Sequence, residues 1–199
     1  MPEKTLNLFI IGPSGCGKST QAKLIAEKYG LIHLSMGQLL RDEIAAKSPL
    51  GLEAQSYVEK GQWAPNELVF RILTANLEKV DNKNFIVDGF PRHIDQMKDM
   101  DNYLESKGRI ANLIIHLDVT AQEIADRRQK VAQAGGTFQI GRNDETPEAI
   151  AARQKSYDDS ITPIFEYLNQ DSRLLRVDGN RPIEPIFADT CLRIEKLSI

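Results

Sequence analysis

One stretch of the sequence, residues 6–28, constrains the fold more than any other. An apolar run, Leu6 to Ile11, has the length of a buried parallel strand and stops at a glycine. Residues 12–19 then read GPSGCGKS, which fits the phosphate-loop pattern G-x-x-x-x-G-K-[ST]. Apolar positions at helical spacing follow the loop. Strand, loop and helix in this order predict a polyphosphate-binding loop at the start of an α/β domain.

The residue types of the loop indicate its chemistry. Glycines let backbone N–H groups turn inward around phosphates, and the following helix points its N-terminal dipole at the same anion. Lys18 adds a positive charge near the β- and γ-phosphates, and the Ser19 hydroxyl is placed to ligate Mg²⁺. A turn that merely caps a helix is the alternative. The preceding strand and the Lys-Ser pair argue against that alternative.

A second motif, Asp88-Gly89-Phe90-Pro91-Arg92, ends another apolar run. Ligands of α/β sheets bind at the carboxyl ends of strands, where Asp88 can hold Mg²⁺ directly or through water. Gly89 permits close approach of the backbone to a ligand, and Arg92 offers a planar fork for two hydrogen bonds to a phosphate. A strand-ending turn with a solvated arginine is the other interpretation, and the phosphate loop upstream favours the functional one.

The rest of the chain alternates short apolar runs with helical patterns. This alternation predicts a three-layer α/β/α sandwich with a five-stranded parallel sheet and right-handed crossovers. The loop at 133–141 breaks both periods and is rich in glycine, so we expect it to be mobile. Besides the first strand, we predict strands at 31–35, 85–88, 113–117 and 173–177, and helices at 37–58 (a pair), 66–79, 94–106, 121–133, 147–168 and 182–197.

Composition narrows the class of protein. With 199 residues, 41% of them hydrophobic, the chain can bury one core, which predicts a single domain across 1–199. We see no signal peptide and no apolar run of membrane-spanning length, so we expect a cytoplasmic protein without a membrane partner. The formal net charge of −3 argues against nucleic acid as a partner. Cys16 and Cys191 lie in unlike settings, which predicts two free thiols.

In their residues and their order, the motifs resemble those of the adenylate kinase family. The resemblance covers essentially the whole chain. It implies a phosphate-loop NTPase fold and reversible phosphoryl transfer from Mg-ATP to AMP, giving two ADP, usually in a monomer. It rests on residues 12–21, Leu34-Ser35-x-Gly37-x-Leu39-Leu40-Arg41, residues 88–92 with Gln96, Gly141-Arg142-x-Asp144 with Arg153, and Val177-Asp178-Gly179.

The resemblance also implies where each substrate binds, with an inserted AMP lobe at 36–65 and a short lid at 128–142. The ATP residues would be Gly12, Pro13, Ser14, Gly15, Cys16, Gly17, Lys18, Ser19, Thr20, Arg127 and Gly179. The AMP residues would be Met36, Arg41, Trp63, Ala64, Gly89, Arg92, Gln96, Arg142 and Arg153. The catalytic charges would be Lys18, Arg92, Arg127, Arg142 and Arg153, with Ser19 and Asp88 on Mg²⁺.

The chemistry of transfer agrees with so many arginines. Two nucleotides bring two anions together, and one charge pair at about 4 Å near a protein surface is worth roughly 4 kcal/mol. Fixed guanidinium groups can therefore promote the reaction without a covalent nucleophile. The predicted lid contains no cysteine, so its ligand count excludes a zinc-bound lid.

Several positions depart from the family pattern. Ser19 replaces a usual Gly, Gln38 a usual Asp, Met36 a usual Thr, and Val131 a usual Arg, while Trp63-Ala64-Pro65 replaces a more aliphatic stretch. A kinase for UMP, CMP or several monophosphates therefore stays open, although Gln96 favours AMP. A nucleotide-binding switch protein is a distant alternative, because Asn82-Lys83-Asn84 matches only half of a guanine-reading motif and precedes a strand.

Overall fold

The computed structural model describes residues 5–58, 64–133, 147–169 and 172–197. Five parallel strands form one sheet in the order β2-β3-β1-β4-β5, as the alternating pattern predicts. Each strand lies within one residue of its predicted bounds. The strands are β1 (Asn7–Ile11), β2 (Ile32–Ser35), β3 (Phe85–Asp88), β4 (Leu113–Asp118) and β5 (Leu174–Asp178).

Eight helices of the described residues connect and cover these strands. They are α1 (Lys18–Tyr29), α2 (Met36–Ala45), α3 (Pro49–Val58), α4 (Asn66–Glu78), α5 (Ile94–Ser106), α6 (Ala121–Gln133), α7 (Pro147–Leu168) and α8 (Ile183–Glu195). Gly30 ends α1 with a left-handed φ of 66°, where a glycine avoids the strain that a side chain would add. The described part of the predicted lid, 128–133, forms the last turns of α6, and the remainder of 128–142 lies outside the described residues.

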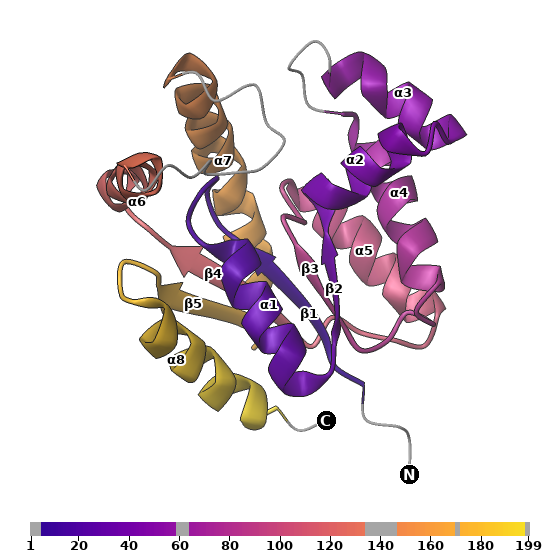
Figure 1. The fold of residues 1–199 in the computed structure, drawn as a ribbon. Coiled ribbons are helices and arrows are strands. Elements are labelled where there is room, and N and C mark those ends of the chain that lie inside the picture. The colour runs from indigo at the N-terminus through magenta and orange to yellow at the C-terminus, as the bar shows by residue number, and fades with distance from the viewer. Residues whose placement is uncertain (1–4, 59–63, 134–146, 170–171, 198–199) are drawn as a thin grey trace.

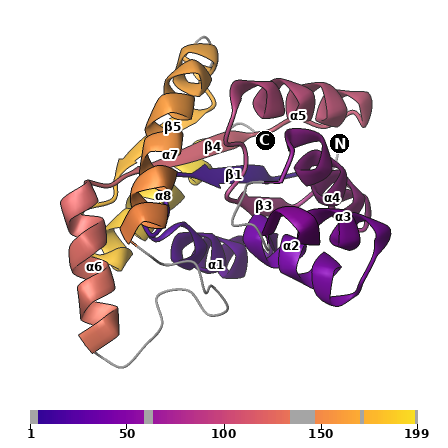
Figure 2. The same ribbon diagram turned by 90° about the horizontal axis from the view of Figure 1, so that it is seen from above.

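The sheet is the middle of three layers, because alternate residues of each strand face opposite sides. Leu8 and Ile10 of β1 face a core built with α1, α6 and α8, whereas Phe9 and Ile11 face a second core built with α4, α5 and α7. Figure 2 shows α1 and α5 on opposite sides of β1. The predicted α/β/α sandwich is therefore confirmed.

The helices α2 and α3 form a small lobe that packs on α4. Ala54 of α3 is fully buried against Leu68 and Ile72 of α4, so the lobe has an apolar anchor of its own. In Figure 1 this lobe and the start of α7 lie on opposite sides of the phosphate loop. None of the described helices is both long and apolar enough to span a membrane.

Candidate active site

The phosphate loop joins β1, the central strand, to α1. Gly12, Gly15 and Gly17 all have positive φ, at 152°, 89° and 100°, so the turn depends on glycine. A Cβ at Gly12 would lie 2.8 Å from the Cys16 sulfur, which leaves no room for a side chain. The Lys18 ammonium donates to the carbonyl oxygens of Gly12 (2.8 Å) and Pro13 (2.7 Å). The side chain of the lysine thus folds back along the loop that precedes it.

The hydroxyl of Ser19 donates a hydrogen bond to the Asp88 carboxylate at the end of β3. Burial alone would raise the pKa of Asp88, but the His33 imidazole, the charge of Lys18 and the Ser19 hydroxyl outweigh burial and lower it below its ordinary value. Asp88 therefore carries a negative charge at neutral pH although it is only 4% exposed. The two predicted magnesium residues are in direct contact.

These two residues fit a magnesium ion that arrives with ATP. Among the described residues, no group of three or more His, Cys, Asp or Glu side chains could hold a metal ion. Mg²⁺ bound to a nucleotide needs only one or two protein oxygens, because phosphates and water occupy the other positions. Ser19 and Asp88 supply one hydroxyl and one ionised carboxylate. A further neighbour of Asp88 is His33 of β2, whose Nε2 lies 3.9 Å from the carboxylate. No sequence motif indicates this histidine, which is near Asp88 because β2 and β3 are adjacent strands.

Arg127 of α6 joins three separate parts of the predicted ATP side. Its guanidinium donates to the carbonyl oxygens of Cys16 (2.9 Å) and Gly179 (2.6 Å) and to the Glu123 carboxylate (2.8 Å). A Cβ at Gly179 would collide with the Val119 side chain, so this turn needs a glycine. The structure therefore brings the phosphate loop, Arg127 and Gly179 together. Glu123, which orients the arginine, is an addition that the motif did not reveal.

On the opposite side of β1, four of the residues predicted to bind AMP lie together just after the carboxyl end of β3: Met36, Gly89, Arg92 and Gln96. The side-chain N–H of Arg92 donates to the Gly89 carbonyl (3.0 Å), which turns the guanidinium back over this strand end. Arg41 of α2 donates to Gln38 (2.7 Å), and Gln38 donates to Asp42 (2.6 Å). The unusual Gln38 therefore helps to position the arginine that is predicted to hold a monophosphate.

Two further predicted AMP residues have definite surroundings. Met36 is 2% exposed and belongs to the second core, next to Gly89, so its side chain packs mainly against protein. Ala64 packs against the small core under the lobe. Trp63 and Arg142 lie outside the described residues, and Arg153 belongs to α7 with a side chain that is likewise outside the described part.

Gln96 is buried in the first turn of α5, with 4% of its surface exposed. Its side-chain oxygen accepts the backbone N–H of Arg92 (2.7 Å), and its nitrogen donates to the Asn66 side-chain oxygen (2.9 Å). Asn66, the first residue of α4, is a neighbour that sequence reasoning missed, because it lies far from Gln96 along the chain and in no motif.

Near its carboxyl end, the interior strand β4 also carries a buried histidine that no motif indicates. The ring nitrogen Nε2 of His116 on β4 lies 2.6 Å from the Tyr157 hydroxyl on α7, and Phe165 packs edge-on against the ring at 4.7 Å between centroids. Burial is the largest cause that lowers the pKa of His116 to about 4; the charge of Asp118 raises this pKa, whereas the positive charges of Arg176 and Lys18 lower it. The histidine therefore stays neutral in the folded protein at physiological pH.

The sheet order, the phosphate loop on its central strand and the carboxylate on the next strand define an α/β protein of the phosphate-loop kinase class. A family model described as adenylate kinase matches residues 10–173. The chain therefore belongs to the adenylate kinase family.

Several curated relatives are also named adenylate kinase, and each of them aligns with this chain over most of its length. The adenylate kinase of Clostridium tetani (strain Massachusetts / E88) is 34% identical, over 92% of this chain and 95% of the relative. That of Nitrobacter hamburgensis is 35% identical, over 92% of this chain and 89% of the relative. That of Xanthomonas campestris pv. campestris (strain 8004) is 36% identical, over 87% of this chain and 91% of the relative. The chain is thus similar to these enzymes over most of its length.

Proposed function

We propose that the protein transfers a phosphoryl group reversibly from Mg-ATP to AMP, giving two ADP. One observation carries this proposal: the phosphate loop and the Asp88–Arg92 motif lie at the same edge of the sheet, on the adjacent strands β1 and β3. A donor polyphosphate and an acceptor monophosphate bound there would meet above β1. The name of the relatives supports AMP as the acceptor.

On the donor side, the loop amides and Lys18 bind the ATP phosphates, and Arg127 secures the loop to the turn at Gly179. Ser19 and Asp88 would hold Mg²⁺, directly or through water, where the ion would supply positive charge beside the phosphates. The remaining ATP residues of this group are Gly12, Pro13, Ser14, Gly15, Cys16, Gly17 and Thr20.

On the acceptor side, Arg41 and Arg92 hold the monophosphate, and Gln96 faces the base, with Gly89 giving the backbone close access. Met36, Trp63 and Ala64 serve the base, and Arg142 and Arg153 supply charge for AMP and for the transferred group. The charges of these arginines offset the repulsion between donor and acceptor, so no covalent intermediate is needed. We expect the enzyme to act as a monomer in the cytoplasm, with an AMP lobe at 36–65 and a lid at 128–142.

A coupled assay with ATP and Mg²⁺ tests the proposal directly. The purified protein should phosphorylate AMP faster than CMP, UMP or GMP, and the reverse reaction should form ATP from ADP. Omission of Mg²⁺ should abolish turnover. A protein that phosphorylates no nucleoside monophosphate would contradict the proposal, and a preference for UMP or CMP over AMP would replace it with pyrimidine monophosphate kinase activity.

A further inference from the structure

The helix α7 divides into two parts near Pro163, which lies inside it. Proline has no backbone N–H, so the carbonyl oxygen four residues earlier cannot receive the usual helical hydrogen bond. The part after this break is well anchored, because Ile164 and Leu168 are fully buried in the second core. The Tyr167 hydroxyl also donates to the Asp101 carboxylate of α5 (3.0 Å). Packing therefore fixes the carboxyl-terminal part of α7.

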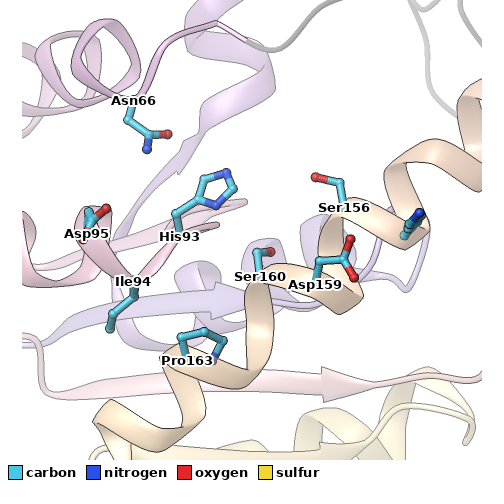
Figure 3. A pocket seen from close by; sticks show the side chains of 9 residues that line it. Asn66, His93, Ile94, Asp95, Ser156, Asp159, Ser160 and Pro163 are labelled. Carbon is cyan, nitrogen blue, oxygen red and sulfur yellow. The ribbon is translucent and has the colours of Figure 1, made fainter.

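The amino-terminal part of α7, residues 147–160, instead borders a cavity of about 550 Å³ (Figure 3). The cavity is lined on one side by Ser156, Asp159 and Ser160 of this part, and on the other side by Asn66 and His93 at the starts of α4 and α5. It separates this face of the helix from α4 and α5. Contacts on this face therefore cannot fix where the amino-terminal part lies.

Tyr157 connects the amino-terminal part of α7 to the sheet. Its hydroxyl lies 2.6 Å from Nε2 of His116 on β4, and the two rings are nearly parallel, with 9° between their planes. Phe165, beyond the break in α7, packs edge-on against the same histidine ring and restrains it. The side chains of Gln154 and Ser160, by contrast, bond to residues of α7 itself. The contact with His116 thus ties this part of the helix to β4.

This contact joins two neutral groups. Burial lowers the pKa of His116 to about 4 and raises the pKa of Tyr157 far above its ordinary value, so neither side chain ionises near neutral pH. His116 is only 4% exposed, which keeps water from competing freely for the hydrogen bond. The bond can therefore hold α7 in place throughout the catalytic cycle.

The contact also lies next to the phosphate loop. His116 is in register with Ile11, the last residue of β1, and the loop follows directly. Residue 153 lies one helical turn before Tyr157, on the same face of α7. Figure 1 shows the start of α7 beyond the carboxyl ends of the strands, at the end of the sheet where the loop lies. The attachment of Tyr157 to β4 therefore sets the height and rotation of the turn that carries Arg153.

We propose that the hydrogen bond between Tyr157 and His116 positions Arg153 for phosphoryl transfer, by fixing the amino-terminal part of α7 beside the phosphate loop. This inference rests on the proposed function, in which Arg153 supplies charge for AMP and for the transferred group. Tyr157 and His116 are positioning residues, since they act on the phosphates only through Arg153. A small displacement of a guanidinium lowers turnover, because the stabilisation of the transition state depends on its geometry.

The first test measures by hydrogen exchange whether the bond holds α7 in the free protein. Tyr157→Phe removes only the hydroxyl, so amide exchange in 147–160 should become at least about fivefold faster while exchange in 161–168 stays unchanged. Tyr167→Phe is the matched control, because it removes a hydroxyl from the anchored part of the same helix and leaves Asp101 paired with Arg173. It should not change exchange in 147–160. Exchange that stays as slow in Tyr157→Phe as in the wild type would overturn the inference.

The second test is kinetic, with Mg-ATP and AMP as substrates. In Tyr157→Phe kcat should fall about tenfold while the KM for ATP stays within about twofold, and Tyr167→Phe should keep the kcat of the wild type. His116→Leu removes the partner of the hydroxyl and should cause the same loss, whereas His116→Gln keeps a polar group there and should retain most of the turnover. Equal losses in Tyr157→Phe and Tyr167→Phe, or in the two His116 variants, would overturn the inference, as would an unchanged kcat in Tyr157→Phe.

A combined variant shows whether Arg153 transmits the effect. If Tyr157 acts through Arg153, the addition of Tyr157→Phe to Arg153→Ala should lower kcat no further. A further loss of about tenfold would overturn the inference, because another group would then be responsible. Full turnover in Arg153→Ala would overturn it together with the role assigned to Arg153, while the kinase proposal would still stand on AMP phosphorylation by the wild type. Absence of AMP phosphorylation by the wild type would overturn both proposals.

Discussion

At the scale of single residues, the charged side chains of the site have different kinds of hydrogen-bond partner. Lys18 and Arg92 contact backbone carbonyl oxygens, whereas Asp88 contacts a hydroxyl. Backbone acceptors hold a cation in place without neutralising it. Both side chains are thus held in place by neutral acceptors, and the charge of Lys18 also acts on Asp88.

Replacement of Lys18 or Arg92 should impair catalysis far more than folding. Both cations would stabilise charge that develops in the transition state, so Lys18→Ala and Arg92→Ala should each lower kcat by at least about a hundredfold. Thermal unfolding should shift little, because these side chains bond to carbonyl oxygens of loops and do not belong to the apolar cores. Lys23→Ala, at an exposed position of α1, is the control. Near-normal turnover in either variant would contradict the assigned role.

His116 should make the stability of the fold depend on pH. Its folded-state pKa is about 4 against an ordinary 6.5, so the unfolded chain takes up the proton first as the pH falls. The stabilisation is complete above pH 6.5 and is lost as the pH falls to about 4. The loss should be on the order of 3 kcal/mol.

Chemical denaturation at several pH values between 7 and 4 checks this expectation. In His116→Gln, which keeps a polar side chain beside Tyr157, the free energy of unfolding should depend less steeply on pH than in the wild type. His93→Gln, at an exposed position, controls for the loss of an imidazole. Parallel curves for wild type and His116→Gln would show that another group is responsible.

At the scale of elements, the small lobe depends on close contact between α2 and α3. Gly51 of α3 lies directly against the backbone of Glu43 and Ile44 at the end of α2, with no room for a Cβ. Its N–H donates to the Ser48 hydroxyl (2.9 Å), which in turn donates to the Glu43 carboxylate. The turn between the two helices is thus fixed by backbone packing as well as by side chains.

Gly51→Ala should therefore loosen the lobe without unfolding the sheet. The added methyl group would meet backbone atoms, which cannot rotate away, so α3 must shift from α2. Hydrogen exchange should increase in residues 36–58 and remain unchanged in β1 and β3, and the KM for AMP should rise more than that for ATP. Ser56→Ala, on the exposed side of α3, is the control. Exchange that stays as slow as in the wild type would show that α3 accommodates the methyl group in place.

The elements themselves were predictable because buried parallel strands are continuous apolar runs bounded by glycine and polar turns. Phe85 to Asp88 has both signals, and the predicted and observed bounds agree. Contacts between elements were not predictable in the same way. Gln96 and Asn66 are in contact only because α4 and α5 pack side by side, and the sequence around either residue does not indicate this contact. The burial of Met36 likewise depends on helices that lie far along the chain.

At the scale of the whole molecule, the lobe and the lid should respond together to the two substrates. A linked ATP–AMP analogue would engage Arg41 of the lobe and the arginines at 142 and 153 at once. We expect it to slow hydrogen exchange in residues 36–65 and 128–142 together, whereas ATP alone should protect mainly the second segment. Equal protection of both segments in the free protein would contradict this expectation.

The order of strands places the two halves of the site on opposite sides of β1. The residues proposed to read the acceptor base lie on β3 and its neighbouring helices, between positions 32 and 96 of the chain. Apart from Asp88, the donor residues precede this stretch in the phosphate loop or follow it at Arg127 and Gly179. A single uninterrupted segment thus encodes the choice of acceptor. Recombination between related genes can exchange this segment as one piece. The recipient enzyme would then take on the acceptor preference of the donor gene and continue to use ATP.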